Sequence, residues 1–160
     1  MPQITIEYMI MIPMLILQIF LFPLTAGWIM NTWVDSRQTL ALQETASHVG
    51  STIQQVYSAL NHESISTGAV DIRLPVTPFI EGYVYAGNAS LRTSGLNSSQ
   101  YLDITLRFQG AQIETTTSVT LGQNVQWDAD SKFMSNSTNA KLIAEKMAND
   151  TILMYFEGVD

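Results

Sequence analysis

The sequence contains no cysteine, which excludes disulfide bonds, thiol catalysis and zinc sites built on thiolates. Basic residues are also few, with seven lysines and arginines against fourteen acidic residues and a formal net charge of -7. The seven are scattered along the chain, whereas a nucleic-acid interface needs clustered lysine and arginine to neutralise phosphates. We therefore predict that nucleic acid is not a partner.

Signals for catalysis or cofactor binding are sparse as well. His48 follows Glu44 by four residues, but one histidine and one glutamate do not make a metal site. The stretch Asp128-Ala129-Asp130 has the opening spacing of a calcium loop, yet Lys132 takes the next alternate position and the required glycine is missing. No Ser-His-Asp arrangement, phosphate-binding glycine loop or carboxylate pair stands out. We predict no catalytic residue, no metal and no cofactor, and expect the chain not to be an enzyme.

Charge is rarest near the N-terminus, where the stretch from Ile4 to Trp33 carries one charged residue, Glu7. As a helix this stretch would reach about 45 Å, which exceeds the ~30 Å hydrocarbon core of a bilayer. A helix that is apolar on every side must be buried in lipid or among other helices. No basic residue precedes Arg37, and the run is too long for a cleaved secretory signal peptide. We expect the segment to stay in the mature protein as a membrane or assembly helix.

Beyond Val34 the apolar residues become a stripe with helical spacing. The stripe, called here the seam, consists of Leu42, Ala46, Val49, Ile53, Val56 and Leu60. It predicts that the helix continues to about Asn61 and is half-buried, either against the chain's own sheet and neighbouring helices or in a coiled-coil dimer. The predicted organisation is a helix over residues 1–62, with an apolar half (1–33) and an amphipathic half (34–62), and a β domain over residues 63–160.

After the helix, apolar and polar residues alternate with a period of two, as in half-buried antiparallel strands. The stretches with this character are 70–76, 79–86, 90–93, 101–108, 112–121 and 151–157. Gln109-Gly110 predicts a tight hairpin turn and Gly122 a break, whereas 139–147 favours a short helix by propensity. The predicted fold class is α+β, a long N-terminal helix followed by an antiparallel sheet or sandwich.

Four Asn-X-Ser/Thr sequons occur in the predicted β domain, each in polar surroundings that are typical of turns. Their acceptor residues are Asn88, Asn97, Asn136 and Asn149. The alternative to N-glycosylation is chance enrichment in a sequence that is rich in serine and threonine. We expect this domain to carry N-glycans at these residues.

The start of the helix resembles a known family. Gln3-Ile4-Thr5-Ile6-Glu7-Tyr8, followed by the apolar run, is similar to the archaeal type IV pilins with a class III signal peptide, in which Gln opens the mature chain. Glu7 followed by Pro13 within an apolar run also resembles the TadE-like minor pilins. The resemblance is limited to the N-terminal helix, and it leaves open whether the chain is a major or an accessory subunit.

The resemblance implies a subunit that is trimmed by a prepilin peptidase, held in the membrane before assembly and polymerised through its N-terminal helix by the pilus assembly machinery. The mature chain would begin at Met1 or at Gln3. The residues implied in assembly are Gln3, Glu7, Tyr8, Pro13 and Pro23. Glu7 either lies at the water interface, where its negative charge stabilises the N-terminal end of the helix dipole, or pairs with the N-terminal amine of another subunit. The two prolines are expected to kink or loosen the helix, and Pro23 marks the candidate region of melting on polymerisation.

We therefore predict a structural subunit of a type IV pilus-like surface filament, extracellular and self-associating, with a role in adhesion. The alternative is a single-pass membrane-anchored accessory pilin or surface-binding protein.

Overall fold

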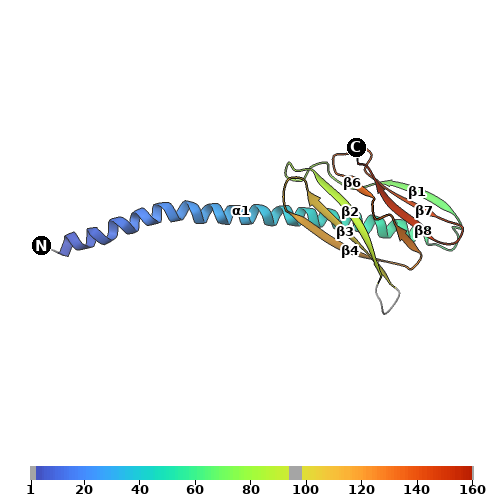
Figure 1. Cartoon of the computed structure of the whole chain (residues 1–160), viewed down its shortest axis with the longest axis horizontal. Coiled ribbons are helices and arrows are strands. Elements are labelled where there is room, and N and C mark those ends of the chain that lie inside the picture. The colour runs from blue at the N-terminus through green and yellow to red at the C-terminus, as the bar shows by residue number, and fades with distance from the viewer. Residues whose placement is uncertain (1–2, 94–98, 160) are drawn as a thin grey trace. The chain divides into compact units, whose positions relative to one another are not determined.

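The computed structural model describes residues 3–93 and 99–159, and the side chains of residues 3–7 lie outside that description. The described chain forms one long helix, α1 (Gln3–Leu60), followed by eight strands (Figure 1). This architecture confirms the predicted α+β class. The chain divides into two compact units, Met1–Arg37 and Gln38–Asp160, so the second half of α1 belongs to the same unit as the strands.

The first unit consists of the first half of α1. The helix is continuous through Pro13 and Pro23, although each proline removes one backbone donor, and the ribbon curves gently within this unit (Figure 1). Neither proline therefore interrupts the helix in the structure of the single chain.

The second unit contains two four-stranded sheets. The strands are β1 (Gly68–Arg73), β2 (Tyr85–Thr93), β3 (Gln100–Phe108), β4 (Glu114–Leu121), β5 (Val125–Trp127), β6 (Lys132–Met134), β7 (Lys141–Lys146) and β8 (Ile152–Glu157). One sheet has the order β1-β7-β8-β5 and the other β4-β3-β2-β6. The named pairs are antiparallel except for β5 with β8, which is parallel. The domain is thus mixed at one edge rather than purely antiparallel.

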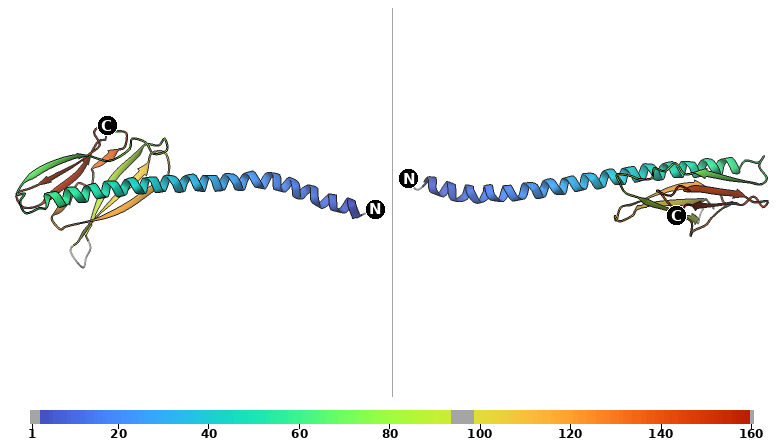
Figure 2. Two further views of the ribbon diagram at one scale, coloured as in Figure 1. Left: turned by 180° about the vertical axis from the view of Figure 1, so that it is seen from behind. Right: turned by 90° about the horizontal axis from the view of Figure 1, so that it is seen from above.

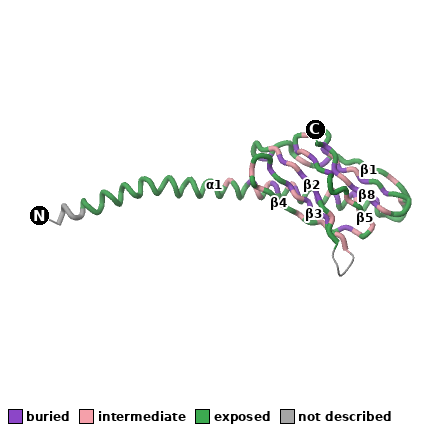
Figure 3. The backbone as a smooth tube through the Cα atoms, in the orientation of Figure 1, coloured by how far each residue is buried: buried purple, intermediate pink, exposed green. Residues whose placement is uncertain are grey.

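The core forms where the seam of α1 meets both sheets. All six seam residues are at most 4% exposed, and they share one hydrophobic cluster with the inward-facing residues of β3, β7 and β8. Figure 2 shows this part of α1 lying along the sheets, and Figure 3 shows buried and exposed residues alternating along the strands. A Cβ at Gly50 would lie 2.9 Å from Cγ1 of Val119, which shows how closely the helix approaches β4. The chain's own sheets therefore cover the seam, as the first of the two alternatives expects, and no apolar stripe is left there for a coiled-coil partner.

Strand β7 corrects the prediction of a short helix at 139–147. Its residues pair with β1 on one side and with β8 on the other, and Leu142, Ala144 and Lys146 alternate as buried positions. Pairing on both edges outweighs the modest helix propensity of this stretch, because each backbone group gains a partner from a neighbouring strand.

The prediction of a strand at 79–86 is also wrong for most of its length. Glu81 and Gly82 both have positive φ, and they form a turn flanked by the isolated bridge between Ile80 and Tyr83. Strand β2 begins only at Tyr85, whose hydroxyl donates to the Thr77 carbonyl at 2.9 Å. The predicted 90–93 strand is the second half of β2.

The predicted turn after β3 is present but longer than expected. Gly110 has φ +85°, and the loop runs from Gln109 to Ile113 before β4 begins. The predicted break at Gly122 directly follows the last residue of β4, Leu121. Strands β5 and β6, of three residues each, were not expected from the sequence.

Candidate functional site

The first candidate site is the apolar surface of α1 between Tyr8 and Trp33. Every described side chain of this stretch is exposed, including Phe22 at 75% and Trp28 at 71%. The helix is long and apolar enough to cross a membrane. From Tyr8 to Trp33 it rises about 38 Å, which is long enough to cross the ~30 Å hydrocarbon core of a bilayer and to reach the headgroups on both sides. Such a surface is stable only against lipid or against other apolar helices.

Most hydroxyl groups on this stretch are satisfied within the helix itself. Thr25 donates to the carbonyls of Leu21 at 3.1 Å and Phe22 at 3.0 Å, and Thr32 donates to the carbonyl of Trp28 at 3.0 Å. These bonds let polar side chains enter an apolar medium without an external partner.

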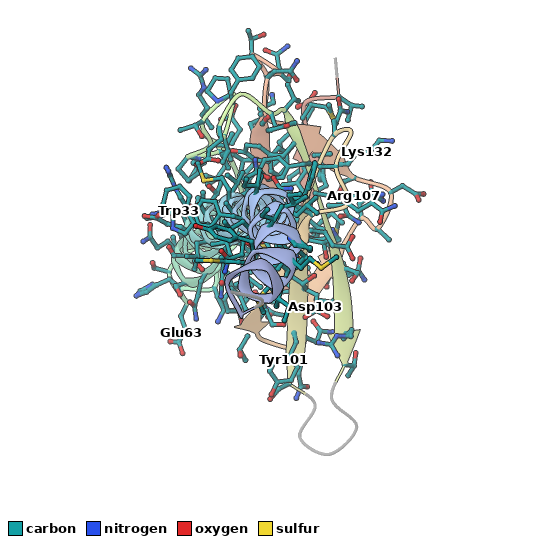
Figure 4. All side chains as sticks on the ribbon, turned by 90° about the vertical axis from the view of Figure 1, so that its left-hand side faces the viewer. Trp33, Glu63, Tyr101, Asp103, Arg107 and Lys132 are labelled. Atoms are coloured by element: carbon teal, nitrogen blue, oxygen red, sulfur yellow. The ribbon has the colours of Figure 1, made fainter. Side chains whose placement is uncertain are left out.

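Aromatic and charged residues mark the far end of the stretch. The guanidinium carbon of Arg37 lies 4.9 Å from the centre of the Trp33 ring, and Trp33 (labelled in Figure 4) is 54% exposed. Tryptophan and arginine favour the level of lipid headgroups, where the ring and the charge are both stabilised. Residues 33–37 thus have the chemistry of a boundary between an apolar medium and water.

The residues predicted to act in assembly lie along this same helix. Gln3 and Glu7 fall within α1, and their side chains lie outside the described ones. Tyr8 is 60% exposed at the start of the apolar surface, and Pro13 and Pro23 lie inside it.

The predicted glycosylation sites fall into two structural classes. Asn136 and Asn149 are exposed in turns, and the side-chain oxygen of Asn149 accepts from the backbone of Thr151 at 3.2 Å. Asn88 is exposed but lies within β2, paired with both β3 and β6, which differs from the turn expected for it. Asn97 lies outside the described residues.

The second candidate surface is the outward face of the sheet β4-β3-β2-β6, which no pattern in the sequence predicted. Arg92 on β2 forms a two-point ion pair with Asp103 on β3, with Nη2 to Oδ1 at 2.9 Å, and Ser118 on β4 donates to the same carboxylate. The hydrogen bonds from Arg92, and then that from Ser118, lower the pKa of Asp103 below its ordinary value. Asp103 is labelled in Figure 4.

The same outward face continues as a polar surface away from this ion pair. Thr105 and Thr116 share a hydrogen bond at 3.0 Å, and Asn88 lies opposite Thr105 in the register. The face presents hydroxyl, amide and charged groups, which suit contact with polar molecules.

The residues that were considered for metal binding do not gather into a ligand set. Glu44 and His48 are 3.8 Å apart on the exposed side of α1, and Asp128 turns its carboxylate toward the backbone N–H of Asp130 at 3.1 Å. Within the part of the chain that the structure describes, no group of three or more histidine, aspartate or glutamate side chains is arranged to hold an ion.

No protein-family model, no curated protein and no solved structure matches this chain.

Proposed function

We propose that the chain is a structural subunit of a type IV pilus-like cell-surface filament. In this proposal the first half of α1 packs among copies of itself in the filament core, and the β domain forms the outer surface. The observation that carries the proposal is the contrast within one helix: the seam from Leu42 to Leu60 is covered by the chain's own sheets, whereas the stretch from Tyr8 to Trp33 is exposed on every side. The pilin-like start at Gln3 to Tyr8 supports the type of filament.

Before assembly the same helix lies in the membrane, where its length and apolarity suit a single span. Processing by a prepilin peptidase and extraction by the assembly machinery follow from the pilin-like start. The polar outward face of β4-β3-β2-β6 and the sequons in turns support an adhesive, glycosylated exterior.

A second candidate function is that of a single-pass membrane-anchored accessory pilin or surface-binding protein. The observation that favours it is that one bilayer suffices to cover most of the apolar stretch, since about 20 residues span the hydrocarbon core. In this case the helix stays in lipid and the β domain acts alone at the cell surface.

Shearing filaments from intact cells separates the two candidates. Electron microscopy of the sheared fraction, with mass spectrometry of its main subunit, is expected to identify this chain as the abundant component. A chain found in the membrane fraction and absent from every filament would leave the accessory role as the better account.

A substitution in the helix tests how the subunit assembles. Glu7→Val is expected to leave the amount of membrane-inserted protein unchanged but to reduce filament yield at least several-fold, because the carboxylate would no longer offset a neighbour's amine in an apolar core. Glu63→Gln is the matched control, since it removes one negative charge from an exposed position beyond the helix. Normal filament yield from Glu7→Val would contradict the proposed role of Glu7 in assembly.

A further inference from the structure

Two polar groups in the middle of the apolar stretch, a side-chain amide and a backbone carbonyl, differ from their neighbours in their hydrogen bonding. Among the described residues, no hydrogen bond or ion pair reaches the exposed side-chain amide of Gln18. The backbone carbonyl of Ile19 would normally accept from the residue four positions later, but that residue is Pro23, which has no N–H. An amide without a bond and a carbonyl without its usual helical donor therefore lie within one turn of each other.

Gln18 and Pro23 also border the same hollow on the side of the helix. The hollow measures about 600 Å³, and its other lining residues include Leu15 and Phe22. Thr25 lines it too, but its hydroxyl donates to the carbonyls of Leu21 and Phe22 rather than to that of Ile19. The hollow is thus bordered by apolar side chains, by Gln18 and by Ile19, whose carbonyl lacks its usual helical donor.

We propose that this hollow is a contact between two copies of the chain, in which the Gln18 amide of one copy donates to the Ile19 carbonyl of the next. Gln18 lies about 15 Å along the helix from Tyr8 and about 22 Å from Trp33, so both groups sit deep in any apolar medium that covers the stretch. Lipid tails offer neither donor nor acceptor, and an unpaired amide at this depth is costly. A second copy at the same depth carries the complementary group.

The donor and the acceptor of the contact are different groups on the same helix. When the amide of one copy bonds to the carbonyl of a second, parallel copy and the bond is not returned, the amide of the second is free for a third. Such a head-to-tail contact can repeat from copy to copy rather than closing on a pair. The inference deepens the proposed filament function and rests on the self-association which that function requires.

Energy transfer between full-length chains in phosphatidylcholine vesicles tests the contact without filaments. Since the chain has no cysteine, Ser58→Cys provides a single exposed position for donor and acceptor dyes. Gln18→Leu removes the donor, and Pro23→Ala restores an N–H that engages the Ile19 carbonyl within the helix. Each is expected to weaken association about 3-fold to 30-fold, the range for hydrogen bonds between membrane helices.

The double variant and a control make the test specific. Gln18→Leu with Pro23→Ala is expected to associate no more weakly than either single variant, because both remove the same bond. Pro13→Ala is the control, since it restores a helical bond outside the hollow and is expected to leave association unchanged.

Unchanged association in Gln18→Leu would overturn the proposal. A loss in Gln18→Leu without a loss in Pro23→Ala would overturn the assigned acceptor, because the amide would then pair elsewhere. If the vesicle results are as expected but sheared filaments lack the chain, the contact stands and the filament function fails. If filaments contain the chain while Gln18→Leu associates normally, the filament function stands and the contact fails.

Discussion

Shortening one side chain in the middle of the seam should lower the free energy of unfolding of the β domain by several kcal/mol. Ile53 is fully buried in the cluster that joins α1 to both sheets. Ile53→Ala removes three buried carbons, which corresponds to about 2.4 kcal/mol at ~0.8 kcal/mol per methylene. The cavity left behind adds to this loss, so the expected total is about 3 to 4 kcal/mol. The better helix propensity of alanine returns only a few tenths of a kcal/mol and cannot offset it.

Thermal unfolding of the full chain in detergent micelles measures this effect through the near-ultraviolet circular dichroism of the β domain. A loss of ~3 kcal/mol is expected to lower the melting temperature by roughly 10 °C for a domain of this size. Gln54→Ala is the matched control, because Gln54 is the next residue on the same helix and is exposed. The control should melt within about 1 °C of the unaltered chain, as is usual for surface positions.

Equal melting temperatures for Ile53→Ala and Gln54→Ala would contradict this prediction. In that case the seam would contribute little to the domain, and the second half of α1 would be available for contact with other chains. Reduced cooperativity with an unchanged midpoint would also count against it, since a buried core residue acts on the whole unit.

Three further predictions follow from single contacts. Gly87→Ala should lower the melting temperature by at least several degrees, because a Cβ there overlaps the ring of Phe133 and lies 2.8 Å from Cδ2 of a neighbouring leucine. The pKa of Asp103 is lowered in the folded chain, so the stabilising effect of its carboxylate is present above the ordinary carboxyl pKa and is lost as pH falls through the folded pKa. Asp103→Asn should therefore destabilise the fold at pH 7 and make little difference at about pH 2. Melting temperatures measured across this pH range would show the effect. Glycopeptide mass spectrometry should find higher occupancy at Asn136 and Asn149 than at the sequon within β2, because turns can enter an enzyme site without breaking strand pairs.

The helix and the longest strands were predictable because their signals are local. The seam repeats at helical spacing over five turns, and residues 101–108 alternate at every position, so burial on one face follows from the sequence alone. The same holds for the apolar half of α1, whose composition already demands an apolar environment.

The short strands depend on partners that are distant in the sequence. Strands β5 and β6 have three residues each, too few for a period to show, and each exists because a longer strand offers an edge. Strand β7 was mistaken for a helix for the same reason, since its two neighbours lie far from it along the chain.

The candidate sites also differ in whether they depend on local sequence signals or on residues that are distant in the sequence. The apolar surface was visible in the sequence, whereas the ion pair of Arg92 and Asp103 depends on the register of two strands, and Ser118 joins it from a third. No spacing in the sequence brings these three residues together, because a slip of one position would turn each to the opposite face.

The two halves of α1 contain similar apolar residues and differ in what buries them. In the second half, apolar residues occupy one stripe and the chain provides two sheets to bury it, so this half folds with its own domain. In the first half, apolar residues occupy every side, and every described side chain from Tyr8 to Trp33 is exposed. All the buried hydrophobic residues of the described chain lie from Leu42 onward, so the β domain draws nothing for its core from the apolar stretch. In the proposed filament this stretch would exchange lipid for copies of itself, and such an exchange would leave the core of the β domain intact.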